Sequence, residues 1–377
     1  MKIGIITLPL NDNYGGILQA YALLKVLQEM GHEPQIISKP YSINMSLFKK
    51  LSKNCRQIAR KIIINKQNPW NKRDKEIENY LHTYTNNFII KYIKRHKPGS
   101  KYSNIKEGEF NALVVGSDQV WRPIYWGRSL SNAYLSFAKQ WNVKRIAYAA
   151  SFGTKEWQYT TRLTKECSSL AKLFDAVSVR EDSGIELCNK NLGVDAEHVL
   201  DPTLLLEKED YINLIKQNNQ EESQGNLFCY ILDNSKKISD SIKYIEEEYK
   251  LKGFQVKAKN DPHMLKSGEC INEDHIIPSP TKWLRAFMDA KMVFTDSFHG
   301  CVFSIIFNKP FWVLGNKERG NARFDSLLKQ FNLESRRIDL QDINNTNLNT
   351  PIDWEKVNTI KKEWQKKSFD FLKNNLQ

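Results

Sequence analysis

The first part of the chain changes from one hydrophobic spacing to another. Residues 3–8 form a short, nearly continuous apolar run, which is typical of a buried strand, whereas apolar residues recur at helical spacing over 17–27. Gly31 ends this helix, and residues 34–38 form a second apolar run. The pattern predicts strand, tight loop, helix and strand, which is the unit that builds parallel sheets.

Further apolar runs that end in polar loops predict strands at 112–115, 145–150, 176–181 and 198–203. A second series of elements follows, with predicted strands at 227–232, 254–257, 292–295 and 310–314 and predicted helices at 236–250, 281–290 and 301–307. Because ligands of open α/β sheets bind outside the carboxyl ends of the strands, we look for function in these polar loops.

This alternation predicts an α/β protein of two Rossmann-like domains with a cleft between them, covering residues 1–203 and 204–350. At 377 residues the length also favours two domains. In the segment 351–377, Asp353 can cap a final helix, which we expect to pack back on the first domain.

Residues 41–105 interrupt the first domain with amphipathic stretches, which predict a helical insertion. The chain has a net charge of +13, and this segment holds 15 Lys and Arg against 3 Asp and Glu. It is a solvated helical face, a nucleic-acid surface or an electrostatic tether to anionic lipid. Nucleic acid is the weaker interpretation, because no nucleic-acid-binding motif accompanies the charge.

Several function classes have little support in the composition. The six cysteines are scattered, which argues against a structural zinc and a disulfide framework, and the seven histidines show no metal-ligand spacing. No segment reaches the ~18 consecutive apolar residues of a membrane span, and residues 1–7 are too short a run for a signal peptide. We therefore expect a cytoplasmic protein without a metal, and the basic segment would allow a peripheral location at the inner face of the cell membrane.

His299 is the first candidate for catalysis. It lies between a predicted strand and a predicted helix, in the run 295–300, where an imidazole can transfer a proton near neutral pH. A helix N-terminus beside it favours an anionic ligand. The alternative is a histidine that only caps the helix or bonds a backbone carbonyl.

Other polar residues follow predicted strands in the same way. Asp118 could orient a sugar hydroxyl or act as a base, or form a local turn, and Arg180 could bind a carboxylate or phosphate, or pair with an adjacent acidic residue. Arg319 and Arg323 are a second cationic cluster or solvated loop charges. The backbone at 15–16 could hold a phosphate, but the spacing is not the dinucleotide fingerprint.

Six short motifs, taken in order, resemble the polysaccharide pyruvyl transferase family. They are NYGGILQAYAL (13–23), GSDQVW (116–121), YAASFG (148–153), SVRE (178–181), LDPT (200–203) and TDSFHG (295–300). The resemblance runs from residue 3 to about 330 and leaves the basic insertion and the last helix outside.

The resemblance implies a glycosyltransferase-B-like pair of domains that moves a pyruvyl group from phosphoenolpyruvate (PEP) onto two hydroxyls of one sugar, without a metal or cofactor. By motif, the family's functional residues fall on Asp118, Arg180 and the triplet Ser297, Phe298 and His299. We also expect the first motif to contribute to substrate binding, through Asn13, Tyr14, Gly15 and Gly16.

One position departs from the family. Ser297 stands where many members have arginine, so one cation is missing. Because PEP carries three negative charges, we expect Arg180 with Arg319 or Arg323 to supply the pairing.

The sequence therefore predicts a bacterial ketal pyruvyltransferase that acts on a capsule or exopolysaccharide precursor, with a polyprenyl-diphosphate-linked oligosaccharide as acceptor. Two alternatives stay open. One is a glycosyltransferase that uses a sugar nucleotide, and the other is a non-catalytic glycan-binding relative in which Ser297 marks lost chemistry.

Overall fold

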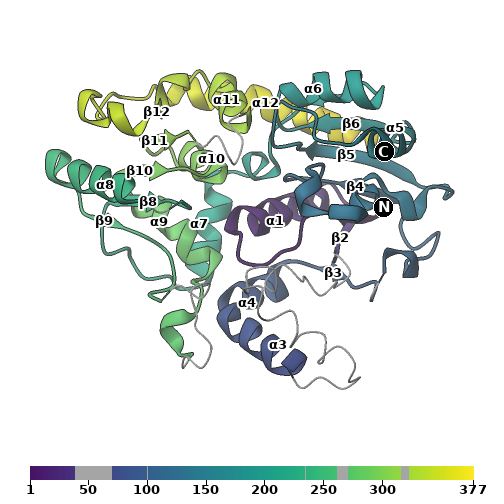
Figure 1. The fold of residues 1–377 in the computed structure, drawn as a ribbon, viewed down its shortest axis with the longest axis horizontal. Coiled ribbons are helices and arrows are strands. Elements are labelled where there is room, and N and C mark those ends of the chain that lie inside the picture. Colours follow the sequence, from purple (N-terminus) through teal and green to yellow (C-terminus); the bar gives the residue numbers. More distant parts are fainter. Residues whose placement is uncertain (39–69, 100, 234, 261–270, 316–321) are drawn as a thin grey trace, which may run out of the picture.

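The computed structural model describes residues 1–38, 70–99, 101–233, 235–260, 271–315 and 322–377. They form two parallel sheets that lie side by side, each covered by helices (Figure 1). The predicted fold class, α/β with two Rossmann-like domains, is confirmed. Of the predicted insertion, residues 41–69 and 100 lie outside the described residues.

The first sheet has the order β3-β2-β1-β4-β5-β6-β7. Its strands are β1 (Lys2–Ile6), β2 (Glu33–Ile37), β3 (Arg95–His96), β4 (Ala112–Val115), β5 (Lys144–Ala150), β6 (Ala176–Val179) and β7 (Glu197–His198). The strand order reverses between β1 and β4. Such a reversal leaves a crevice at the carboxyl ends of the two strands, because the connections leave to opposite faces of the sheet.

The second sheet has the order β12-β11-β10-β8-β9. Its strands are β8 (Leu227–Tyr230), β9 (Gly253–Phe254), β10 (Met292–Thr295), β11 (Phe311–Leu314) and β12 (Arg337–Ile338). Here the order reverses between β8 and β10. Each sheet therefore has one reversal point, and the predicted strand 254–257 is shorter than expected.

The helices form a hydrophobic core that is shared by the two sheets. They are α1 (Tyr14–Glu29), α3 (Trp70–Leu81), α4 (Thr83–Tyr92), α5 (Thr161–Ala171), α6 (Ser183–Leu187), α7 (Lys208–Gln217), α8 (Lys236–Tyr249), α9 (Pro280–Asp289), α10 (Phe298–Ile306), α11 (Ala322–Gln330) and α12 (Trp354–Asn375). Buried residues of α1, α7, α9, α10 and α12 belong to one cluster. Burial of this apolar surface is the main force that holds the domains together.

The last helix, α12, returns to the first domain. The Asp353 carboxylate accepts a hydrogen bond from the backbone N–H of Lys356 (3.0 Å) and so caps the helix. Further along, the Ser368 hydroxyl accepts a hydrogen bond from the backbone N–H of Leu200 (3.0 Å). The helix thus packs beside the segment that follows β7, as Figure 1 shows in yellow.

In the described parts of the chain, no helix is both long and apolar enough to cross a bilayer.

Candidate active site

A cavity of about 320 Å³ lies where the reversal points of the two sheets face each other. It is lined by Asp12, Asn13, Asp118, Gln119, Arg122, Tyr125, Tyr230, Leu232, Asp296, Ser297, Phe298, His299, Arg323 and Phe324. Most of these residues follow β1, β4, β8 or β10, which are the four strands beside the reversals. The cavity is large enough for a small-molecule substrate, at the lower end of the ~300–1,000 Å³ range of ligand sites.

Asp118 reaches the cavity from a tight turn after β4. Gly116 has φ +137°, and a Cβ there would lie 1.9 Å from the carbonyl oxygen of Tyr148, so only glycine fits. Oδ1 of Asp118 accepts hydrogen bonds from the Gln119 backbone N–H (2.9 Å) and from Nη2 of Arg180 (3.3 Å). Asp118 is therefore both part of the local turn and part of the cavity wall.

Arg180 lies behind the cavity wall and does not line the cavity. Its side chain is 1% exposed, and Nη1 donates to Oδ2 of Asp201 at 2.6 Å while Nη2 donates to Asp118. Burial opposes the charge on Arg180, but Asp201 and Asp118 raise the pKa of the guanidinium above its ordinary value. The guanidinium pairs with these two carboxylates, not with the adjacent acidic residues considered in the sequence.

Asp201 is a hydrogen-bond acceptor for several groups at once. Besides Arg180, its carboxylate accepts from the Thr203 backbone N–H (3.0 Å), the Thr203 hydroxyl (2.7 Å) and the Ser117 hydroxyl (3.3 Å). Burial alone would raise the pKa of Asp201, but His299 and Arg180 outweigh burial and hold it well below its usual range. The carboxylate therefore stays ionised inside the protein.

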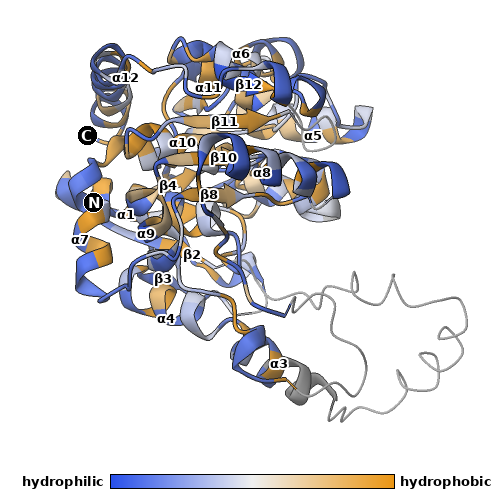
Figure 2. Cartoon of the chain, turned by 90° about the vertical axis from the view of Figure 1, so that its left-hand side faces the viewer, coloured by the Kyte–Doolittle hydropathy of each residue, from blue (hydrophilic) through white to orange (hydrophobic). Residues whose placement is uncertain are grey.

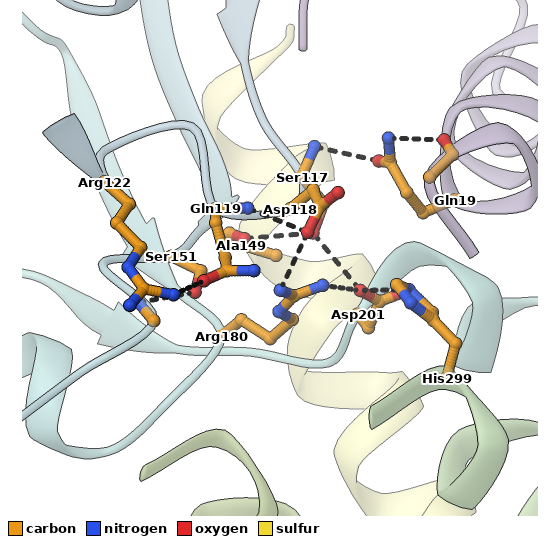
Figure 3. Close-up of polar contacts among 12 residues, drawn as sticks. Gln19, Ser117, Asp118, Gln119, Arg122, Ala149, Ser151, Arg180, Asp201 and His299 are labelled. Carbon is orange, nitrogen blue, oxygen red and sulfur yellow. Dashed lines mark hydrogen bonds and ion pairs between the residues drawn. The ribbon is translucent and has the colours of Figure 1, made fainter. Parts of the chain in front are cut away.

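His299 brings the second domain to this cluster. Helix α10 begins at Phe298, so His299 lies in its first turn and not in a loop before it. Nε2 is buried and lies 3.7 Å from Oδ2 of Asp201 (Figure 3). The imidazole points to the first domain and does not cap its own helix.

The start of α1 provides the surface on which the His299 ring rests. A Cβ at Gly15 would lie 2.0 Å from Nδ1 of His299, so the ring occupies the space that any other residue would need. Asn13 caps α1 by accepting from the Gly16 N–H (3.1 Å), and the Tyr14 hydroxyl donates to the carbonyl of Pro278 (2.9 Å). Of the first motif, Asn13 alone lines the cavity, and the other three residues shape the domain contact.

Two arginines line the cavity, and the sequence indicated one of them. The one indicated is Arg323, which belongs to α11. The other is Arg122, whose Nη1 donates to Oε1 of Gln119 (2.9 Å). Burial, followed by repulsion from Arg180, lowers the pKa of Arg323 to about 10. Arg319 lies outside the described residues.

The Phe298 ring contacts both buried arginines. The guanidinium carbon of Arg180 lies 4.4 Å from the ring centroid, and that of Arg323 lies 5.7 Å away. Such cation–π contacts favour the charged form of both arginines. Phe298 is therefore a structural neighbour of the cations as well as part of the cavity wall.

Several residues of the site were not singled out in the sequence. Asp201 lies in a quoted motif and Arg122 directly follows one, so proximity to a motif was the available signal. Asp12 likewise directly precedes a motif, whereas Tyr125 and Tyr230 carry no such signal. Within the described ranges, no group of three or more His, Cys, Asp or Glu residues is placed to hold a metal ion.

Comparison with known proteins identifies a family. A family model described as polysaccharide pyruvyl transferase matches residues 13–318 of the chain. No curated protein matches the chain at a significant level.

Among solved structures, the glycotransferase of kitacinnamycin is 10% identical, with 100% of this chain and 99% of that chain covered and a TM-score of 0.48. UDP-GlcNAc 2-epimerase from Neisseria meningitidis is 10% identical (98% and 94% covered, TM-score 0.46). MurG from Acinetobacter baumannii is 9% identical (97% and 94% covered, TM-score 0.41).

We expect Gly15→Ala to destabilise the protein, although alanine normally stabilises a helix by up to about 1 kcal/mol relative to glycine. The added methyl group would push His299 away from Asp201 and cost about 1–3 kcal/mol, which is typical of overpacking. Thermal unfolding measures the effect. The control is Gly16→Ala, in which the new Cβ would lie 3.2 Å from Nδ2 of Asn13. This variant should change the stability little. A Gly15→Ala protein as stable as wild type would contradict this geometry.

The low pKa of Asp201 predicts a pH-dependent contribution to stability. Because the folded-state pKa is depressed, the stabilisation is present above the unfolded value of about 4 and is lost as the pH falls below it. The difference in unfolding free energy between wild type and Asp201→Asn should be about 3 kcal/mol near pH 7. Below about pH 4 this difference in unfolding free energy should decrease by up to about 1.4 kcal/mol per pH unit.

Urea denaturation between pH 7 and pH 3 measures this difference. The exposed Asp240→Asn is the control and should show no such trend. A constant difference for Asp201→Asn across the pH range would show that the carboxylate is not the ionised partner of Arg180 and His299.

Proposed function

The chain belongs to the polysaccharide pyruvyl transferase family, and from this we propose that it transfers a pyruvyl group from PEP to two hydroxyls of a sugar. We further propose that the sugar belongs to a lipid-linked precursor of a bacterial cell-surface polysaccharide. The observation that carries the proposal is the cavity in which Asp118 of one domain and His299 of the other meet two arginines.

The cavity offers matching partners for the anionic groups of PEP. Arg122 and Arg323 line it, and guanidinium groups bind carboxylate and phosphate oxygens with two parallel hydrogen bonds. Bringing an anion next to Arg323 would also offset the burial and repulsion that lower its pKa. Arg323 lies beside Phe298, so it can replace the arginine that the resemblance expects at Ser297.

Helix α10 adds a further favourable electrostatic contribution. Its N-terminal residues Ser297, Phe298 and His299 line the cavity, and the side chain of Ser297 makes no capping hydrogen bond. The backbone N–H groups of a first helical turn have no partner within the helix and favour an anion. We place the phosphate or carboxylate of PEP near this turn.

The proposed reaction begins with proton transfer from His299 to the methylene carbon of PEP. A sugar hydroxyl adds to the adjacent carbon, and its proton ends on the phosphate that leaves as the C–O bond to phosphate breaks. A second hydroxyl of the same sugar then adds in place of the phosphate, and its proton returns to His299. The products are a cyclic pyruvate ketal and inorganic phosphate. Asp118, whose two hydrogen bonds are both accepted by Oδ1, can take a hydroxyl proton or orient the hydroxyl through Oδ2.

We propose that Asp201 positions the His299 ring for this proton transfer. Nε2 is buried and lies 3.7 Å from Oδ2 of Asp201, and the ring rests against Gly15. Asp201 and Arg180 act as positioning residues, since neither lines the cavity.

Removal of the imidazole tests the proposed proton transfer. We expect His299→Asn to lower kcat for acceptor-dependent phosphate release from PEP by about 10²–10⁴-fold. The readout is phosphate release with lipid-linked galactose, mannose and glucosamine acceptors, run beside labelled nucleotide sugars. The control is His32→Asn, because His32 directly precedes β2 and so lies at the amino ends of the strands, away from the cavity. A folded His299→Asn enzyme with full turnover would contradict the assignment, and transfer from a nucleotide sugar would favour a glycosyltransferase.

Removal of a cavity cation tests the donor site. We expect Arg323→Gln to raise KM for PEP about 10–100-fold, since a hydrogen bond to a charged group contributes about 1.5–3 kcal/mol. Steady-state kinetics with varied PEP measures the change. The exposed Arg162→Gln on α5 carries the same charge change away from the cavity and should leave KM unaltered. Equal KM values for Arg323→Gln and wild type would remove Arg323 from the donor site.

A further inference from the structure

Helix α4 has one exposed face that combines aromatic, aliphatic and basic side chains. Tyr84 is 50% exposed and Ile90 is 70% exposed, although α4 buries its opposite side against the core. At 100° per residue, Tyr84, Asn87, Ile90 and Lys91 lie on one side of the helix, and Lys94 continues this side just beyond its end. We call these five residues the α4 face.

The segment of the chain that carries the α4 face is basic. Residues 79–106 contain six Lys and Arg and no Asp or Glu, and Lys91, Lys94 and Lys97 are exposed. Two acidic residues nearby, Asp210 and Glu29, pair with Lys25 of α1. Nζ of Lys91 donates a long hydrogen bond (3.4 Å) to Oδ1 of Asn218 and lies 4.9 Å from the centroid of the Tyr92 ring. Neither partner is a carboxylate, so an external anion can still pair with this ammonium group.

A hollow of about 730 Å³ lies beside the α4 face, between α4 and α1. Its lining includes the apolar residues Leu24 and Ile90 and the cations Lys91 and Lys94, beside the ion pair of Lys25 with Glu29. Apolar and cationic groups side by side match a phospholipid, which offers an anionic headgroup next to its acyl chains. Figure 2 shows α3 and α4 at the end of the molecule away from α6 and α12.

We infer that the α4 face docks on an anionic phospholipid membrane, with Ile90 inserted into the interface and Lys91 and Lys94 at the headgroups. Tyrosine is enriched at membrane–water interfaces, and lysine is attracted to anionic leaflets. A nucleic acid would use the same cations but has no need of an exposed isoleucine. The solvated-face interpretation likewise gives no reason for Ile90.

The α4 face adjoins the strip of chain that borders the cavity. Leu81 is the last residue of α3 and lies two residues before α4 begins. Its carbonyl accepts a hydrogen bond from the Ile277 N–H (2.9 Å), and the carbonyl of the next residue, Pro278, accepts one from the Tyr14 hydroxyl. Asn13 beside Tyr14 lines the cavity. Membrane docking would therefore bring the cavity near lipid-linked molecules. The use of such molecules as acceptors rests on the proposed function, whereas the docking itself does not.

Vesicle flotation tests the docking with the whole chain and without PEP or acceptor, so its outcome is independent of the enzymatic proposal. We expect wild type to float with phosphatidylcholine vesicles that contain one quarter phosphatidylglycerol and not with phosphatidylcholine alone. The double variant Lys91→Gln/Lys94→Gln should partition about 25-fold more weakly, about fivefold for each cation. Ile90→Ser should weaken partition about tenfold or more.

Matched controls distinguish binding through the α4 face from nonspecific adsorption to vesicles. Ile185→Ser on α6 removes another exposed isoleucine, and Arg162→Gln/Lys165→Gln on α5 removes two other exposed cations. These controls should bind vesicles as wild type does, and circular dichroism should show that every variant is folded. Three results would overturn the inference. The α4 variants could bind vesicles as well as wild type, or wild type could fail to bind. A single-stranded oligonucleotide could also abolish vesicle binding completely while Ile90→Ser still binds as wild type does.

Discussion

A carboxylate that is fully buried must be paired, and the site of this protein depends on how Asp201 is paired. Its partners come from both domains, with Arg180 after β6 of the first sheet and His299 on α10 of the second. An unpaired charge at this depth would cost several kcal/mol, so removing either partner would destabilise the fold as well as the site. The position of the imidazole is therefore set by the same electrostatic balance that keeps the domains in register.

Backbone shape makes this pairing possible. Gly15 leaves room for the His299 ring, and Gly116 allows β4 to end in the turn that presents Asp118. Because the strand order of each sheet reverses beside these turns, the polar residues of both domains converge on one cavity. The cations Arg122 and Arg323 then lie where an anionic donor can meet His299.

The sequence predicted the architecture well, because apolar runs separated by polar loops determine which strands are buried. Asp118 and His299, which line the cavity, were also singled out in the sequence, because each lies in a polar turn after such a run. The sequence did not predict the role of Arg180. Its spacing shows that a guanidinium follows β6, but it cannot show that Asp201, 21 residues later, neutralises this guanidinium. Arg122 was missed for a related reason, as its place in the cavity depends on a hydrogen bond to Gln119 within an irregular segment.

The central claim is that Asp201 and His299 act as one unit across the domain contact. A double-mutant cycle on acceptor-dependent phosphate release from PEP, with Asp201→Asn, His299→Asn and the combined variant, tests it most directly. If Asp201 acts through His299, the combined variant will have about the same kcat/KM as His299→Asn alone. If the two losses instead multiply, the residues contribute independently and the account is contradicted.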